Sequence, residues 1–417
     1  MDFFLTVINA VLYIILLYSY WIKNKYLNIG VFILSIWAFA ATIGIYYETE
    51  NIIGHIRPIT LFPYIYLFVC TFFMFFPILQ FRNQYLKTII VNLKCVNIMS
   101  AFIIVVTIIP FCENLIYFVT HFSTSDSTEI ISNFNKRYQD ASLTYAYLSS
   151  LARKLNYISH SLQLVALVLL FYYFTLSDKK NKFIIIGLII VYINPLIESI
   201  NILARFMMVI YLFLGMFMFI LFKPLYSQKT KILFYKIILI FGGIIIGAFI
   251  VLTLYRISNF SQKKYSGDFR FLPFISRYVS EGFGNFNGNM YHTDFFTHTD
   301  AVSRRFEIMF GIEEEDLTIS ESSRQFGFAS NYFYTVVGDY YRGYGAVLTF
   351  LIFLIVPYFF YRGCRFKKNM RLSKILLLTM YAKWPLLGIC YDMYLVDGWQ
   401  LVSTSLAILI FYVVEKK

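Results

Sequence analysis

The chain has few charged residues. Only 14% of its 417 residues are Asp, Glu, Lys or Arg, whereas a water-soluble protein carries about 25%. Apolar residues make up 59%, above the usual share of about 45–50%. With so little charge, a chain of this size cannot cover itself with polar surface in water. This composition disfavours a cytosolic enzyme, a secreted disulfide scaffold and a nucleic-acid-binding protein.

Cysteines are also few and scattered. The five cysteines include no CxxC pair and no spacing typical of metal ligands. They are predicted to be small apolar packing residues, and the sequence calls for no cofactor and no metal.

The sequence contains long apolar runs instead of charged residues. Runs of about 20 apolar residues match the hydrocarbon thickness of a bilayer, about 30 Å. The pattern predicts an all-α polytopic membrane protein, formed by residues 1–417 as a single integral membrane domain, with a retained first span and the lipid bilayer as its surroundings. Eleven spans are predicted at 3–21, 28–47, 59–80, 88–111, 157–176, 183–197, 206–222, 232–254, 331–360, 373–391 and 396–413.

Basic residues gather in every second connection between these runs. The basic connections hold more than half of the Lys and Arg residues but only two acids, Asp178 and Glu415. By the positive-inside rule these connections are cytoplasmic. The predicted topology therefore has the N-terminus outside and the C-terminus in the cytoplasm, and the net charge of +13 is an orientation signal.

Two long segments, 113–156 and 256–330, fall on the predicted outer side. Loops longer than about 15 residues are usually functional. Residues 129–156 show apolar positions at helical spacing, which predicts an amphipathic helix on the outer surface. The second loop is rich in aromatic residues, which suit either the headgroup layer or the faces of sugar rings.

The sixth run is short. Residues 183–197 would rise only about 22 Å as a helix, and Pro195 is expected to end it. The polar turn with Glu198 and Arg205 is therefore expected to lie below the outer surface. An arginine at such depth tends to mark a substrate pathway, and a structural ion pair between Glu198 and Arg205 is the alternative interpretation.

Other polar signals have competing interpretations. Lys383 in the tenth run predicts either a buried partner or a catalytic role, and Gly243 with Gly247 predicts close helix packing. Two histidines and two aspartates could bind a divalent ion, although they lie in a polar stretch: His292, Asp294, His298 and Asp300.

Arginines cluster on the predicted outer side. The planar guanidinium suits bidentate capture of phosphate oxygens. Together with the aromatic residues, they point to a membrane-held substrate that carries both sugar and pyrophosphate. The set comprises Arg205, Arg256, Arg270, Arg277, Arg304, Arg305, Arg324 and Arg342.

Two short stretches resemble the O-antigen polymerase (Wzy) and oligosaccharide repeat-unit polymerase family. One is Ser-Arg-Tyr at 276–278 followed by Gly-Phe-Gly-Asn-Phe-Asn at 282–287. The other is Asn-Tyr-Phe-Tyr at 331–334 followed by Gly-Asp-Tyr-Tyr-Arg-Gly-Tyr-Gly at 338–345. The second is similar to the family's N-x-(Y/F)-T…D-(F/Y)-G-x-x-G pattern before a late span. It departs from that pattern because Asp339 is followed by Tyr-Tyr-Arg-Gly.

The resemblance implies a GT-C-like membrane fold and a metal-independent, inverting glycosyltransferase. Such an enzyme transfers a growing glycan from undecaprenyl diphosphate to the terminal sugar of a new lipid-linked repeat unit. It would serve O-antigen, lipopolysaccharide or capsule biosynthesis at a bacterial inner (plasma) membrane, with or without a chain-length regulator protein as partner. The expected catalytic residues are Arg205, Arg277, Arg324, His292 and Asp339. The expected substrate-binding residues are Arg270, Tyr278, Asn331 and Tyr332.

Three other functions stay open at this point. An O-antigen ligase uses the same donor and an essential histidine in the large outer loop. A lipid-linked oligosaccharide flippase or transporter would carry charged residues inside the membrane, and a membrane acyltransferase would place a histidine within a span or at its edge.

Overall fold

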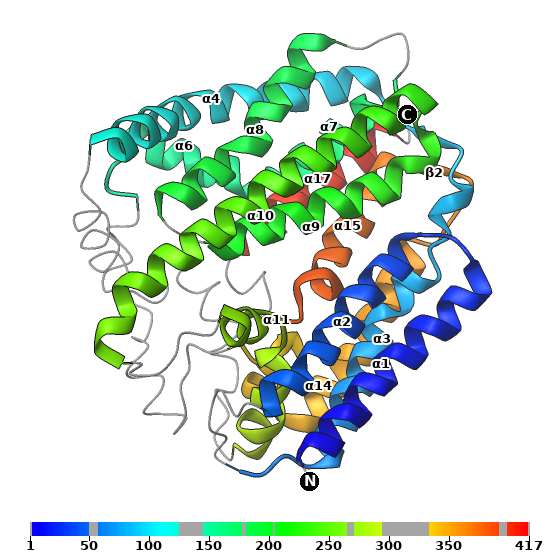
Figure 1. Cartoon of the computed structure of the whole chain (residues 1–417). Helices are drawn as coiled ribbons and strands as arrows, with labels where there is room; N and C mark the ends of the chain where they lie inside the picture. The colour runs from blue at the N-terminus through cyan, green and yellow to red at the C-terminus, as the bar shows by residue number, and fades with distance from the viewer. Residues whose placement is uncertain are drawn as a thin grey trace. The chain divides into compact units, whose positions relative to one another are not determined.

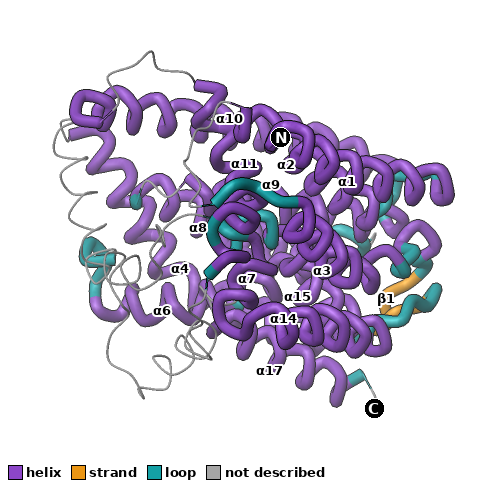
Figure 2. Tube along the Cα trace, turned by 90° about the horizontal axis from the view of Figure 1, so that it is seen from below, coloured by secondary structure: helices purple, strands orange, loops and turns teal. Residues whose placement is uncertain are grey.

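Helices make up nearly all of the structure (Figures 1 and 2). This computed structural model describes residues 2–49, 57–124, 145–176, 181–202, 205–264, 271–293, 333–391 and 398–415. The chain divides into two compact units. Unit 1 comprises residues 1–85, 268–368 and 377–401, and unit 2 comprises residues 86–267, 369–376 and 402–417.

Unit 1 is a helical bundle around an aromatic core. α2 packs on α1 and α11, and α3 packs on α14. Trp37, fully buried, lies within 6 Å of the rings of Tyr13, Phe75 and Phe283, and its Nε1 donates to Pro385 O at 2.6 Å. The helices are α1 (Asp2–Asn24), α2 (Ile29–Thr49), α3 (Leu61–Leu79), α11 (Phe271–Gly288), α14 (Thr335–Gly363) and most of α15 (Leu372–Leu387), with the 3₁₀ turns η1 (Asn83–Tyr85) and η4 (Met290–His292).

Unit 2 is a second helical bundle. α4 packs on α6 and α8, and α9 packs on α7, α8 and α10. A two-stranded parallel sheet joins β1 (Thr88–Ile90) to β2 (Asn369–Arg371), with Ile90 opposite Arg371. The helices are α4 (Leu93–Thr124), α6 (Ser150–Ser161), α7 (Gln163–Tyr173), α8 (Lys182–Asn201), α9 (Arg205–Phe222), α10 (Gln228–Lys264) and most of α17 (Gly398–Val414), with the turn η3 (Lys223–Leu225).

Apolar helices of membrane-spanning length confirm that this is a mostly helical multi-pass membrane protein. Eight described helices are long and apolar enough to span a bilayer, and the bent pair α6 and α7 would make nine. Helix is the expected form because a backbone in hydrocarbon must satisfy its own hydrogen bonds. All eleven predicted runs overlap helices, but α15 and α17 are shorter than a full span, so the count of eleven stays a prediction.

The run 157–176 consists of two helices, α6 and α7, that meet at an angle of 62°, and its assignment as one span stays a prediction. The expectation of a short sixth run is wrong. α8 extends from Lys182 to Asn201 with Pro195 inside it. Its 20 residues rise about 30 Å, enough to span the hydrocarbon. Proline is tolerated inside a membrane-spanning helix, because neighbouring helices and side chains can satisfy the backbone groups that it frees.

Helices also extend into the two predicted outer loops. α4 continues to Thr124, α10 continues to Lys264, and α11 lies wholly within 256–330. The expected amphipathic helix at 129–156 falls largely outside the described residues. Its described end contains the first turns of α6, which begins at Ser150.

A backbone break divides α14 near its start. Gly345 has φ 69° and ψ −176°, a region that residues with a Cβ essentially do not adopt. At the break, the Tyr66 hydroxyl donates to Ala346 O at 2.6 Å. The glycine therefore sets the angle between residues 335–344, which contain most of the second motif stretch, and the rest of α14.

Gly345→Ala is expected to destabilise unit 1 by about 1–3 kcal/mol, because alanine is strained in this conformation. Gly243→Ala is the matched control. A Cβ at Gly243 or Gly247 meets no described atom within 4 Å, so the predicted close packing at these glycines is not found. Alanine at position 243 should stabilise α10 by about 0.5–1 kcal/mol. Thermal unfolding in detergent checks both, and an unchanged Tm for Gly345→Ala would contradict the strain argument.

Candidate functional site

The two stretches that carry the family resemblance meet in unit 1. Glu281 on α11 accepts a hydrogen bond from Phe333 N at 3.1 Å through its Oε1. Asn285, one turn further along the same helix, donates to Phe333 O at 3.2 Å. Both side chains are buried. Two segments far apart in the sequence are thus joined by side chains of one motif that bind the backbone of the other.

Gly282 permits this close approach. A Cβ at this position would lie 2.5 Å from Ile389 O and 3.1 Å from Thr335 N. Since both atoms belong to the backbone, no side-chain movement could make room. The glycine of the first motif is therefore required by the contact with the second.

A short connection between α2 and α3 joins the same junction. Asn287 donates to Thr60 O at 2.7 Å and accepts from Thr60 N at 2.9 Å. Arg57 N donates to Gly288 O at 3.1 Å. These bonds hold Arg57 beside the C-terminal end of α11, where the chain turns into η4.

His292 lies in η4 at this junction. The Tyr341 hydroxyl on α14 donates to Tyr291 O at 3.0 Å, which holds η4 against the second motif. The Nε2 atom of His292 is buried and has no hydrogen-bond partner among the described residues. Burial, and to a smaller extent the charge of Arg57, lower the pKa of His292 below its usual value. The imidazole is therefore neutral at pH 7 and able to accept a proton.

Two carboxylates are buried close to this junction. Glu281 is 2% exposed and Asp339 is 9% exposed, and both act electrostatically on Cys390. Buried carboxylates are costly unless they are hydrogen-bonded, and Glu281 meets that need through Phe333 N. We call the group formed by Arg57, Glu281, Asn285, His292 and Asp339 the motif junction.

The structure places the remaining predicted residues only in part. Arg277 and Tyr278 lie on α11, one turn before Gly282, and Arg205 is the first residue of α9 in unit 2, but the side chains of these three are not described. Nine further candidate residues lie outside the described residues: Arg270, Asp294, His298, Asp300, Arg304, Arg305, Arg324, Asn331 and Tyr332. Of the predicted residues, the structure thus brings together His292, Asp339 and the helix that carries Arg277 and Tyr278.

Sequence reasoning missed Arg57. It is a single arginine in a short connection, and no motif surrounds it. Its predicted outer location was the available signal, and its neighbourhood with His292 depends on tertiary hydrogen bonds that no local pattern reveals.

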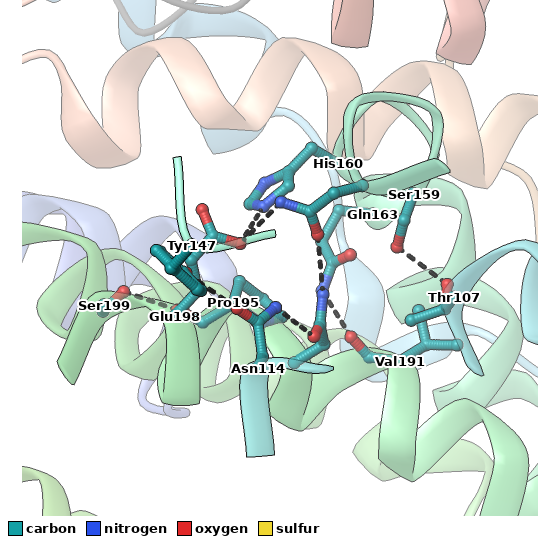
Figure 3. Close-up of polar contacts among 12 residues, drawn as sticks. Thr107, Asn114, Tyr147, Ser159, His160, Gln163, Val191, Pro195, Glu198 and Ser199 are labelled. Atoms are coloured by element: carbon teal, nitrogen blue, oxygen red, sulfur yellow. Dashed lines mark hydrogen bonds and ion pairs between the residues drawn. The ribbon is translucent and has the colours of Figure 1, made fainter. Parts of the chain in front are cut away.

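Unit 2 contains a second polar group, inside its apolar helices (Figure 3). His160 Nε2 and Glu198 Oε2 lie 2.6 Å apart, with the two side chains 17% and 3% exposed. Asn156 donates to the same carboxylate oxygen at 3.1 Å. Amide side chains then extend the network: Asn194 donates to Asn156 at 3.2 Å, and Asn114 donates to Asn194 at 2.9 Å. We call these five residues the unit 2 polar network.

The bend between α6 and α7 places His160 in this network. Ser159 and Thr107 share a hydrogen bond of 2.7 Å before the bend, and Gln163 donates to Val191 O at 2.8 Å after it. These bonds fix α6 and α7 to α4 and α8. Chemically, the pair of His160 and Glu198 can hold one proton between an imidazole and a carboxylate.

Glu198 was predicted to belong to a substrate pathway or to pair with Arg205. Its Oε2 instead contacts His160 and Asn156, while the side chain of Arg205 is not described. His160, at the edge of the predicted fifth span, could be recognised as this partner only from the fold.

Glu198→Ala is expected to destabilise unit 2 by about 1–3 kcal/mol, because it removes the buried carboxylate that binds the Asn156 amide and pairs with His160. The measurement is the Tm of the purified protein. Glu113→Ala is the control, since Glu113 accepts from the Ser149 N and Oγ at the surface and should cost less. Equal decreases in Tm for the two variants would contradict the argument that burial makes the loss of the Glu198 carboxylate costly.

Lys383 has a buried partner. Its Nζ donates to the Gln400 side-chain oxygen, and Lys383 is 3% exposed. A buried partner was one of the two expectations, although a carboxylate was the example considered. This contact explains how α15 carries a cation inside the apolar helices.

No known protein family, curated protein or solved structure matches this chain. The fold defines the class, a mostly helical multi-pass membrane protein, and the motif junction is its candidate site.

Proposed function

We propose that the chain polymerises lipid-linked oligosaccharide repeat units in a membrane. One observation carries the proposal: the two stretches that resemble O-antigen polymerases bind each other directly, and His292 and Arg57 lie where they meet. The proposed setting is the outer face of a bacterial inner (plasma) membrane, with the N-terminus outside and a GT-C-like fold.

The proposed reaction is a single displacement at the anomeric carbon. A hydroxyl oxygen of the terminal sugar on a new repeat unit attacks the anomeric carbon of the growing glycan. The bond from that carbon to the diphosphate oxygen breaks, and its electron pair leaves with undecaprenyl diphosphate. The hydroxyl proton passes to His292 Nε2, and the configuration at the anomeric carbon inverts.

Each proposed role follows from the chemistry of the side chain. Arg57 stabilises the negative charge that develops on the departing diphosphate, an electrostatic effect that is often the largest in catalysis. Arg277, Arg205 and Arg324 are further arginines proposed for the same task. His292 is the general base, and Asp339 and Glu281 orient the motif residues around it. Tyr278, Tyr332, Asn331 and Arg270 are proposed to bind glycan or diphosphate.

EDTA is expected to leave polymerisation unchanged. The donor is already activated by its diphosphate, and arginines supply the positive charge that a divalent ion supplies in other enzymes. The measurement is polymer formation by purified protein with and without chelator. Loss of activity that Mg²⁺ or Mn²⁺ restores would contradict this prediction and favour the metal interpretation of His292 and Asp294.

The unit 2 polar network favours a second candidate function. Ionisable residues inside apolar helices tend to mark substrate or proton pathways, and such a pathway suits a transporter of lipid-linked oligosaccharides. On this alternative, Glu198→Gln would block export while Arg57→Ala would not. The proposed polymerase has the opposite requirement, since Arg57 lies in the motif junction.

Glycan analysis of a deletion strain tests the proposed function. Loss of a polymerase leaves single repeat units on the lipid carrier or on lipid A. Long polymer stranded on undecaprenyl diphosphate would instead identify a ligase. Single units retained on the cytoplasmic side would identify a flippase.

A further inference from the structure

Unit 2 has an apolar groove whose lining includes no residue of the motif junction or of the unit 2 polar network. It encloses about 750 Å³, and α4, α17 and the bend between α6 and α7 line it. Its wall is almost entirely hydrocarbon, with Ile98, Phe102 and Leu406 each more than half exposed. In a membrane protein, such a groove faces acyl chains.

The groove has a defined direction and length. One end is marked by Lys94 at the start of α4 and by Val414 at the end of α17. Glu415, the next residue, acts electrostatically on Cys95, so these two helix ends lie together. From Ser403 to Val414 the groove follows twelve residues of helix, a rise of about 17 Å from the first residue to the last. That length is close to half of the hydrocarbon thickness of about 30 Å, the depth of one leaflet.

Positive charge gathers at the Lys94 end. Lys87 and Lys94 flank β1, which pairs with β2 and so brings Arg371 to the same end. The segments that meet here contain one acid, Glu415. Its carboxylate accepts from Ser373 N at 3.3 Å and Ser373 Oγ at 2.6 Å and interacts with Arg371.

The N-terminus of α4 adds to this positive potential. Asn92 Oδ1 caps the helix by accepting from Lys94 N at 3.0 Å and Cys95 N at 3.3 Å. The helix dipole places partial positive charge at this end. An apolar groove one leaflet long thus terminates in cationic side chains and a helix N-terminus.

We propose that this groove binds one anionic phospholipid. An acyl chain lies between α4 and α17, and the headgroup phosphate contacts Lys94 and Arg371. Ser161 and Leu162 at the bend between α6 and α7 line the groove, so the bound lipid supports the bend that positions His160.

Lipid titration of the full-length protein tests this proposal. The protein is purified in detergent, delipidated, and titrated with phosphatidylglycerol or phosphatidylcholine, with native mass spectrometry and Tm as readouts. Phosphatidylglycerol should bind more tightly and raise the Tm. Lys94→Gln should weaken the binding of phosphatidylglycerol about fivefold, which corresponds to the contribution of one cation near an anionic lipid headgroup. Lys229→Gln, a surface lysine of unit 2 outside the groove, should leave binding unchanged.

Ser403→Trp fills the groove without altering charge and provides a second variant. It should abolish the Tm increase caused by phosphatidylglycerol while the protein without lipid keeps its own Tm. Equal binding of the two phospholipids would overturn the proposal, as would unchanged phosphatidylglycerol binding by both Lys94→Gln and Ser403→Trp. Displacement of phosphatidylglycerol by an equimolar polyprenyl phosphate would also overturn it, since the groove would then select a different lipid.

Discussion

His292→Gln is expected to lower the rate of polymerisation by about 10²–10⁴-fold, the usual contribution of a general base. Glutamine retains a polar side chain of similar reach but cannot accept the hydroxyl proton. The physical basis is the buried Nε2, which has no hydrogen-bond partner among the described residues and lies beside both motif stretches. The measurement is the initial rate of polymer formation by purified protein in lipid vesicles.

Tyr291→Phe is the matched control for His292→Gln. It alters the neighbouring ring in η4 but keeps the backbone oxygen that accepts from Tyr341. We expect it to retain most of the activity. A His292→Gln protein that folds normally and polymerises at the wild-type rate would exclude His292 as the base.

The pH profile separates a base from a merely structural histidine. The pKa of His292 is lowered, so the imidazole is neutral at pH 7 and becomes protonated only as the pH falls below about 6.5. The wild-type rate should therefore be constant near neutrality and fall as the pH drops through this lowered pKa. The residual rate of His292→Gln should lack this decrease.

Arg57→Ala is expected to lower the rate by about 10²–10³-fold, the usual cost of removing one donor that stabilises a developing negative charge. Arg57 is held at the motif junction through its own backbone bond to Gly288 and through the two bonds between Thr60 and Asn287. Arg57→Lys should recover part of the rate, because lysine keeps the charge but not the planar fork. In the source organism, Arg57→Ala should leave single repeat units at normal protein levels.

Arg365→Ala provides the charge-matched control. Arg365 is exposed, as Arg57 is, but it lies in a predicted cytoplasmic connection and is not part of the motif junction, so its loss should not change the rate. If the two substitutions reduced polymerisation equally, net charge rather than the position of Arg57 would explain the effect.

Hydropathy and charge predicted the class of fold well. Runs such as 3–21 and 206–222 form helices because a backbone in hydrocarbon must satisfy its hydrogen bonds within the helix. The bend after Ser161 was not predictable, since neither proline nor glycine stands there and tertiary hydrogen bonds from Ser159 and Gln163 fix it. Pro195 misled in the opposite direction. A proline predicts the end of a helix, but α8 continues through Pro195 to Asn201.

The candidate site was predictable only where it coincides with a motif. His292, Asp339 and the stretch around Arg277 stood out by residue type and by resemblance. Arg57 and Glu281 did not, because their positions depend on contacts with Gly288 and Phe333, which are distant in sequence. A buried pair such as His160 and Glu198 is equally hidden, since 38 residues separate its members.

The most direct measurement uses lipid-linked single repeat units extracted from the deletion strain. Purified protein in vesicles should convert these units into a ladder of longer glycans and release undecaprenyl diphosphate, and Arg57→Ala should form almost none. Wild-type protein that leaves the units unextended, under conditions in which it remains folded and correctly inserted, would contradict the proposal that this chain is a polymerase.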